Sequence, residues 1–295
     1  CRWTNSRTFG KYCCNILDKF IKEKHLMINK IIINLITWFF GLVFFFPILW
    51  MFLTSFKTEM EAIKFPPSFI FELTLVNYFE IQERSNYFKY ALNSITISFG
   101  STFLGIALAI PVSWSLAFIK NKYKDFILLW ILSTKMMPAV GVLVPMYIIF
   151  RDAKLMDTHF GMIVILTLTN LPIIVWLLYN YFAEIPYEII ESSHIDGANI
   201  LNEIISIVLP LSLPGISSAF LLSVILCWNE AFWSLMLTST NSAPLSVFIA
   251  SFSSPEGLFW AKLSAASVMA IMPIMILGWF SQKQLVSGLT FGAIK

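Results

Sequence analysis

Long apolar stretches alternate with short polar segments along most of this chain. Because the hydrocarbon core of a bilayer is about 30 Å thick, a helix needs roughly 20 apolar residues to cross it. Six stretches are long enough, and we expect each to form a membrane-spanning helix. The pattern therefore predicts an all-α, polytopic membrane protein with one transmembrane domain over residues 27–295 and spans at about residues 31–53, 92–119, 126–150, 161–182, 207–237 and 263–280.

Proline is frequent in these stretches. It removes a backbone N–H and clashes with the preceding turn of a helix, so neighbouring helices must satisfy the carbonyls that it frees. Interrupted spans are typical of bundles that line a transport path. Eight of the thirteen prolines fall within or at the ends of the six stretches, namely Pro47, Pro111, Pro138, Pro145, Pro172, Pro210, Pro214 and Pro273.

The composition also indicates a membrane protein. The 295 residues are 58% hydrophobic and 13% charged, whereas a soluble domain carries about 25% charged residues. A net charge of +3 gives no argument for nucleic-acid binding. Neither the four cysteines nor the three histidines have the spacing of a metal site, and we expect no metal and no cofactor.

The first 26 residues differ from the rest. They are much more polar and hold three of the four cysteines, and Met27 is a credible start. We therefore expect residues 1–26 to be a non-native or disordered extension; a lipid-modified Cys1 is the alternative. The first apolar run has no small-residue cleavage site, so we expect it to be retained as a span.

An acidic segment, residues 183–206, separates the fourth and fifth spans and carries five carboxylates but no Lys or Arg. Pro186 suits the first turn of a helix. Gly197 can adopt a positive φ, so it predicts a break between two short helices, and Asn199 is a plausible cap for the second. Ile200, Ile204 and Val208, like Leu201, Ile205 and Leu209, recur at helical spacing and predict a helix that continues into the fifth span.

Two functions fit such a bent helical segment. Its charges can simply keep a surface connector solvated, or the short helix can dock into a groove on a partner. In the second case, movement of the partner would pass to the attached span.

The order of residues in this segment resembles a known signature. Glu191, two small residues, three residues, Gly197, nine residues, and then an Ile-x-Leu-Pro sequence are similar to the E-A-A-x3-G-x9-I-x-L-P signature of ABC-importer permeases. Two serines replace the two alanines, and Asp-Gly-Ala matches the form typical of carbohydrate permeases. The resemblance assigns ATPase docking to Glu191, Ser192, Ser193, Asp196, Gly197 and Ala198, with Ile207, Leu209 and Pro210 at the junction with the span.

Other stretches extend this resemblance over nearly the whole chain from Met27. "FFFPILWMFLTSFKT", "PPSFIFELTLVNY" and the terminal "GLTFGAIK" resemble the second permease subunit of the maltose-type carbohydrate family. "TKMMPAVGVLVPMYIIFRD", "LCWNEAFWSL" and "SSPEGLFWAKLSAAS" are similar to its sorbitol and mannitol branch. The resemblance implies a permease for polyols or related carbohydrates; another sugar or a glycerol-phosphate-type solute is the alternative.

Family membership implies a set of partners and an orientation. No phosphate-binding loop of the Gly-x4-Gly-Lys-Ser/Thr type occurs, so this chain is expected to be non-catalytic, with ATP and Mg bound by two separate ATPase subunits. A second permease subunit, an extracytoplasmic solute-binding protein and alternating access are also implied. Lys and Arg number 12 on the side of the termini and 7 on the other, but 6 and 7 if the chain starts at Met27. The resemblance therefore decides for cytoplasmic termini, in a bacterial inner membrane.

Polar residues within the spans are candidates for the translocation path. An amide can bond a sugar hydroxyl or a neighbouring helix, and tryptophans suit either sugar recognition or the membrane interface. For Lys135, an intramembrane charge, we favour a structural or gating role. The candidates are Asn170, Trp228, Asn229, Glu230, Trp233 and Lys135.

Two other classes of function fit the sequence less well. An ion-coupled secondary transporter would need buried carboxylates in several spans, and only Glu230 is a candidate. An intramembrane enzyme would need a paired catalytic set within the spans, and the sequence offers none.

Overall fold

The computed structural model describes the backbone of residues 9–84, 86–254 and 257–290, and the side chains of residues 30–83, 86–253, 259–279 and 281. The chain forms two units, Cys1–Thr54 and Ser55–Lys295. The described elements are α1 (Phe9–Thr54), α2 (Glu59–Ala62), α3 (Val76–Arg84), α4 (Tyr87–Phe118), α5 (Lys124–Met136), α6 (Ala139–Asp152), α7 (His159–Ala183), α8 (Tyr187–Ile195), α9 (Ile200–Glu203), the π-helix η1 (Ile204–Val208), α10 (Leu209–Leu211), α11 (Leu213–Trp228), α12 (Phe232–Leu237), α13 (Leu245–Ala250), β1 (Ser253–Ser254), β2 (Gly257–Leu258) and α14 (Trp260–Thr290).

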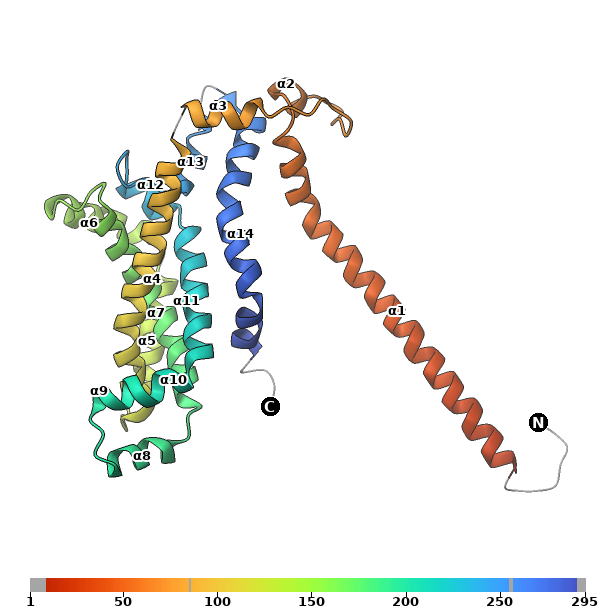
Figure 1. Ribbon diagram of the computed structural model, residues 1–295, viewed down its shortest axis with the longest axis vertical. Helices are drawn as coiled ribbons and strands as arrows, with labels where there is room; N and C mark the ends of the chain where they lie inside the picture. The colour runs from red at the N-terminus through yellow and green to blue at the C-terminus, as the bar shows by residue number, and fades with distance from the viewer. Residues whose placement is uncertain (1–8, 85, 255–256, 291–295) are drawn as a thin grey trace. The chain divides into compact units, whose positions relative to one another are not determined.

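The first unit is the single helix α1 (Figure 1). Its part from Lys30 to Thr54 is apolar enough to span a membrane, and none of its most apolar window is buried within the chain. Residues 9–26, which belong to the segment expected to be non-native or disordered, have helical backbone, while residues 1–8 lie outside the described part. Their origin stays a prediction.

The second unit is a helical bundle in which α4 and α7 pack along each other, with α11 against both and α14 against α11. A core cluster at one end joins α4, α7, α8 and η1 through Trp114, Leu178, Phe182, Ile190 and Val208. The two-residue strands β1 and β2 form a small antiparallel hairpin. Apart from this hairpin, the described elements are helices, so the expected all-α architecture is confirmed.

Among the described residues, four helices are long and apolar enough to cross a membrane, and two bent helix pairs raise the number to as many as six. The expected spans at 31–53, 92–119, 161–182 and 263–280 each correspond to one continuous helix, while the other two differ from the expectation. The four helices are Lys30–Thr54, Tyr87–Phe118, His159–Ala183 and Trp260–Trp279.

The expected third span, 126–150, is wrong as a single helix, because α5 and α6 meet at 86°. Met137, the residue between them, has extended backbone with ψ of 128°. Pro138 follows it, and proline disfavours the helical conformation in the residue before it. By contrast, the prolines at 47, 111, 145, 172 and 273 lie inside continuous helices.

The expected fifth span, 207–237, is also interrupted. The segment Ile200–Leu211 meets α11 at 82°, and α11 ends at Trp228, before the separate helix α12. Pro214 lies at the start of α11, where it cannot donate a hydrogen bond to the preceding turn. The second helix of the acidic segment is therefore joined to the span through a sharp bend and does not run straight into it.

Loops at the end of the second unit opposite α8 are held together by Asp157, which has a positive φ of 51°. Its carboxylate accepts hydrogen bonds of 3.0–3.2 Å from the backbone N–H groups of four successive residues, 239–242. Burial raises the pKa of Asp157, but these four donors outweigh burial and lower that pKa to about 2. The carboxylate thus joins the loop before α7 to the loop after α12.

Candidate functional site

The acidic segment folds as two short helices separated by a turn, as its sequence predicts. Helix α8 begins after Pro186, and the chain turns at Gly197, whose φ of +79° is costly for any residue with a Cβ. The side chain of Asn199 then accepts a 2.8 Å hydrogen bond from the N–H of Asn202 and caps α9. The predicted break and cap are confirmed.

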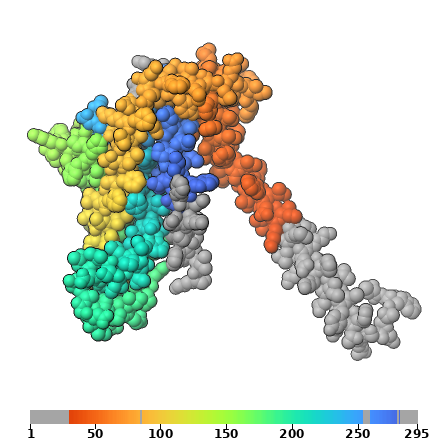
Figure 2. All heavy atoms as spheres, viewed as in Figure 1, coloured from red at the N-terminus to blue at the C-terminus, as the bar shows by residue number. Residues whose placement is uncertain are grey.

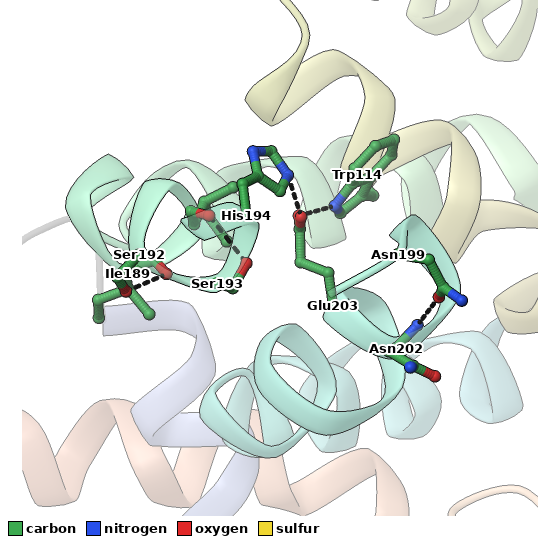
Figure 3. A network of polar contacts seen from close by, with 9 residues as sticks. Trp114, Ile189, Ser192, Ser193, His194, Asn199, Asn202 and Glu203 are labelled. Atoms are coloured by element: carbon green, nitrogen blue, oxygen red, sulfur yellow. Dashed lines mark hydrogen bonds and ion pairs between the residues drawn. The ribbon is translucent and has the colours of Figure 1, made fainter. Parts of the chain in front are cut away.

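Three side chains form a polar network inside this segment (Figure 3). Glu203 is 0% exposed. One of its oxygens lies 2.7 Å from Nε2 of His194 on α8, and the other accepts a 2.7 Å hydrogen bond from the indole N–H of Trp114 on α4. The network therefore connects both short helices of the segment to a long helix of the bundle.

Sequence reasoning missed this network. From the sequence, the five carboxylates of the segment are expected to keep a surface connector solvated, whereas Glu203 is buried. A usable signal was present, since Glu203 precedes the apolar Ile204 and lies four residues before Ile207 on the same side of the helix. A carboxylate at such a position is expected to point toward the bundle.

The docking candidates separate into exposed and buried residues. Glu191, Ser192, Asp196 and Gly197 are exposed, whereas Ser193 is buried, with its hydroxyl bonded to the carbonyl of Ile190 at 2.8 Å. Ser193 therefore packs α8 against the bundle and offers no free surface in this chain. The others lie at or near the junction with the span: Ala198, Ile207 and Leu209 are partly buried, and Pro210 is exposed.

Apolar side chains also project from this segment. Ile195 is 83% exposed and Leu201 64% exposed, and Ile200 and Ile205 are exposed as well. Of the six apolar residues that recur at helical spacing from Ile200 to Leu209, only Ile204 and Val208 are buried. Figure 2 shows the segment from α8 to α10 as a continuous surface at one end of the second unit. Exposed apolar residues beside carboxylates are typical of a docking surface.

The connection to α11 contains an irregular helix. The residues after Glu203 form the π-helix η1, and π-helices are rare and frequent at functional sites. At the following bend, the hydroxyl of Ser212 is buried and has no hydrogen-bond partner. Gly215 lies so close to Tyr181 that a Cβ would meet its ring at 2.2 Å. The start of α11 is therefore closely packed against α7, while the segment before α11 departs from a regular helix.

A second candidate site is a cavity of about 380 Å³ between α5, α6, α7 and the end of α11. Asn170 is central to it: its Oδ1 accepts a 2.9 Å hydrogen bond from Nζ of Lys135, and its Nδ2 lies 3.2 Å from Sγ of Cys227. Lys135 also bonds the carbonyl of Thr169 at 2.9 Å. The amide of Asn170 thus bonds two neighbouring helices and lines the cavity at the same time.

Glu230 and Trp233 line the same cavity. The carboxylate of Glu230 accepts hydrogen bonds from the N–H groups of Phe232, Trp233 and Ser234, at 3.0–3.4 Å. Glu230 therefore has partners for its charge inside the chain.

Two of the six path candidates do not line this cavity. The indole N–H of Trp228 donates to the carbonyl of Ala270 on α14 at 3.3 Å, and Asn229 is exposed and bonds the carbonyl of Ile225 at 2.8 Å. Among the described residues, no group of three His, Cys, Asp or Glu is arranged to hold a metal ion.

Comparison with known proteins identifies the family. A family model described as "Binding-protein-dependent transport system inner membrane component" matches residues 109–290, from the end of α4 through α14. The chain belongs to this family. As a binding-protein-dependent permease it is a membrane component with several apolar helices, and it contains the whole α8–α9 segment within the matched range.

Relatives of this permease are similar over most of their length. The inner membrane ABC transporter permease protein YcjP of Escherichia coli (strain K12) is 31% identical over 277 residues, which are 90% of this chain and 99% of YcjP. The sulfoquinovosyl glycerol transport system permease protein SmoH of Agrobacterium fabrum (strain C58 / ATCC 33970) is 32% identical over 255 residues, 85% of this chain and 88% of SmoH. These relatives are ABC transporter permeases.

A solved structure supports the same fold. The crystal structure of a bacterial ABC transporter involved in the import of the acidic polysaccharide alginate has a TM-score of 0.67 and 20% identity to this permease. The similarity covers 96% of this chain and 99% of the other. At this identity the comparison establishes the fold alone.

Proposed function

We propose that this permease is driven by a separate ATPase that binds the segment from α8 to α9. The observation that carries the proposal is the surface of this segment, which exposes the carboxylates of Glu191 and Asp196 together with the apolar side chains of Ile195 and Leu201. A short helix with apolar anchors and flanking charges suits a groove on a partner. The resemblance of the segment to the docking signature of ABC importers supports the same partner.

The proposed complex contains four kinds of chain. Two ATPase subunits bind ATP and Mg, a second permease forms the other half of the path, and an extracytoplasmic binding protein delivers the solute. Docking of α8 to the ATPase places this segment and both termini on the cytoplasmic side. In this arrangement the chain is the second permease subunit of a maltose-type importer, and it carries no catalytic residue of its own.

The proposed solute is a carbohydrate, and more specifically a polyol such as sorbitol or mannitol. Relatives include permeases named for sulfoquinovosyl glycerol, diacetylchitobiose, and trehalose and maltose. The cavity around Asn170 supports passage of a polyhydroxylated molecule, since it combines an amide, an ammonium and a carboxylate with the indole of Trp233. Aromatic faces and hydrogen-bonding groups together suit sugar recognition. The polyol assignment rests on the sequence stretches that resemble the sorbitol and mannitol branch.

The test is solute-stimulated ATP hydrolysis by the complete complex in lipid. The binding protein is added with sorbitol, mannitol, maltose or trehalose, and hydrolysis is compared with that of the unloaded binding protein. We expect stimulation by at least one of these solutes, and a larger effect of sorbitol or mannitol if the polyol assignment is right. Equal rates with and without every solute would contradict the proposal of a carbohydrate importer.

Replacement of Gly197 by Pro tests the docking segment itself. Proline fixes φ near −65°, whereas this position needs +79°. We expect G197P to abolish stimulation while the chain still inserts into the membrane. The matched control is Gly197→Asn, because asparagine adopts a positive φ more readily than other residues with a Cβ and nothing lies within 4 Å of a Cβ at this position. This variant should retain stimulation. Intact stimulation in G197P would contradict docking through this segment.

A further inference from the structure

We propose that Glu203 is a positioning residue that makes α8 and α4 move as one body. This inference rests on the proposed function, in which α8 receives the movement of the ATPase. The segment containing α8 is covalently joined to α7 on one side and to α11 on the other. Helix α4 has no such covalent connection; it meets α8 through the apolar core cluster and through the hydrogen bonds of Glu203.

The geometry of Glu203 suits this role. Its two oxygens have different partners, His194 on α8 and the indole N–H of Trp114 on α4, each at 2.7 Å. Apolar contacts in the same region, such as those of Ile190 and Ile204, are not directional and allow helices to slide. Hydrogen bonds are directional, so they restrict the relative orientation of the groups that they join. The network therefore fixes α8 relative to α4 in one arrangement.

Helix α4 can pass this movement on to the bundle. Ser113, the neighbour of Trp114, donates a 2.9 Å hydrogen bond to the carbonyl of Val175 on α7. Thr167 on α7 in turn donates to the carbonyl of Ser101 on α4 at 3.2 Å. The two long helices are thus bonded to each other at two levels, so a displacement of α4 reaches the region of Asn170.

The segment after Glu203 is the part that can change shape. The π-helix η1, the 82° bend and the buried, unbonded hydroxyl of Ser212 follow within nine residues of it. A buried polar group without a partner is uncommon in a relaxed structure. An altered bend that gives this hydroxyl a partner would rotate the α8–α9 segment and α4 together against α11.

Stability alone does not account for a fully buried carboxylate at this position. Replacing a buried ion pair with apolar residues of similar volume is often neutral or stabilising. Leucine at position 203 has a similar volume and removes both hydrogen bonds, but it leaves the buried indole N–H of Trp114 without an acceptor and so lowers stability. Glutamine can keep both, because its oxygen can accept from Trp114 and its amide N–H can donate to Nε2 of His194.

The experiment measures the distance between α8 and α4 in the complete complex with its ATPase and partner permease. Spin labels are placed at Glu188 and Val112, both exposed, in a chain whose four native cysteines are replaced by serine. Distances are recorded by double electron–electron resonance without nucleotide and after trapping with ATP and vanadate. The parent chain is compared with Glu203→Leu, Glu203→Gln and Trp114→Phe.

We expect the distance in the parent and in E203Q to be the same in both states. In E203L and W114F we expect it to shift and broaden on trapping, and solute-stimulated hydrolysis to fall about tenfold, which is within the usual range of coupling between sites. Thermal unfolding of E203Q in detergent should match that of the parent. A purely structural residue would instead lower the melting temperature without changing the distance.

Two results would overturn the inference while leaving the proposed function intact: an unchanged distance in E203L on trapping, or a shift in the parent itself. Failure of the ATPase to copurify with the parent chain would contradict the proposed function, and the inference with it.

Discussion

Asp157 provides a quantitative prediction for the loops at the end opposite α8. Its pKa of about 2, against an ordinary value of 3.8, means that the folded state favours the ionised carboxylate. One pKa unit corresponds to 1.36 kcal/mol, so the carboxylate contributes about 2 kcal/mol at neutral pH. In Asp157→Asn, one oxygen is replaced by a donor that faces backbone N–H groups. We expect D157N to lose this contribution, and with it about 5 °C of melting temperature.

The pH dependence has a defined sign. Because the folded-state pKa is depressed, the contribution is complete above the unfolded pKa of about 4 and is lost as the pH falls toward about 2. The difference in stability between the parent chain and D157N should therefore shrink over this window. Other carboxylates titrate in both proteins, and the comparison removes their effect.

The assay is thermal unfolding of purified protein in detergent at several pH values. Asp152→Asn is the matched control, because Asp152 is an exposed aspartate five residues away that pairs with exposed Arg151. Exposed ion pairs contribute little, so D152N should resemble the parent at every pH. Equal stability of D157N and the parent at neutral pH, or a difference that persists unchanged at pH 2, would refute the reasoning.

The remaining predictions concern packing, the turn and the cavity. Gly215→Ala should destabilise the protein by about 1–3 kcal/mol because its Cβ would meet the ring of Tyr181. Gly141→Ala is the control and should unfold like the parent, because the space around its Cβ is open. Equal melting temperatures for the two variants would contradict this prediction. Gly197→Ala should cost roughly 1–2 kcal/mol at a φ of +79° and reduce solute-stimulated hydrolysis, and full stimulation would argue against the turn. Lys135→Met should lower transport while the ATPase still copurifies, and normal transport would remove Lys135 from the path.

The two short helices of the acidic segment were predictable because their signals are local. Pro186, Gly197 and Asn199 act on their own backbone, and the helices, the turn and the cap follow from conformational preferences over a few residues. The network of Glu203 was not predictable in the same way. Its partner Trp114 lies 89 residues away, and only the packing of α4 against the segment brings the two side chains together.

The same contrast between local signals and distant packing applies to the membrane-spanning helices. Prolines inside α4, α7 and α14 leave the helices continuous, whereas Pro138 coincides with an 86° bend. The residue type is the same in each case, so the surrounding packing decides whether a helix continues. Likewise, Lys135, Asn170 and Glu230 were recognised as unusual residues, but their meeting at one cavity depends on the bend between α5 and α6.

The central claim is that the ATPase binds α8, and cross-linking in the assembled complex tests it most directly. Cysteine is introduced at Ser192, which is exposed on α8, and at Ile70, which is exposed. Ile70 belongs to the segment between α2 and α3, two elements that lie far from α8 (Figure 1). We predict that Ser192→Cys forms a disulfide with a cysteine on the ATPase subunit and that Ile70→Cys does not. Cross-linking from Ile70→Cys, with none from Ser192→Cys, would contradict it.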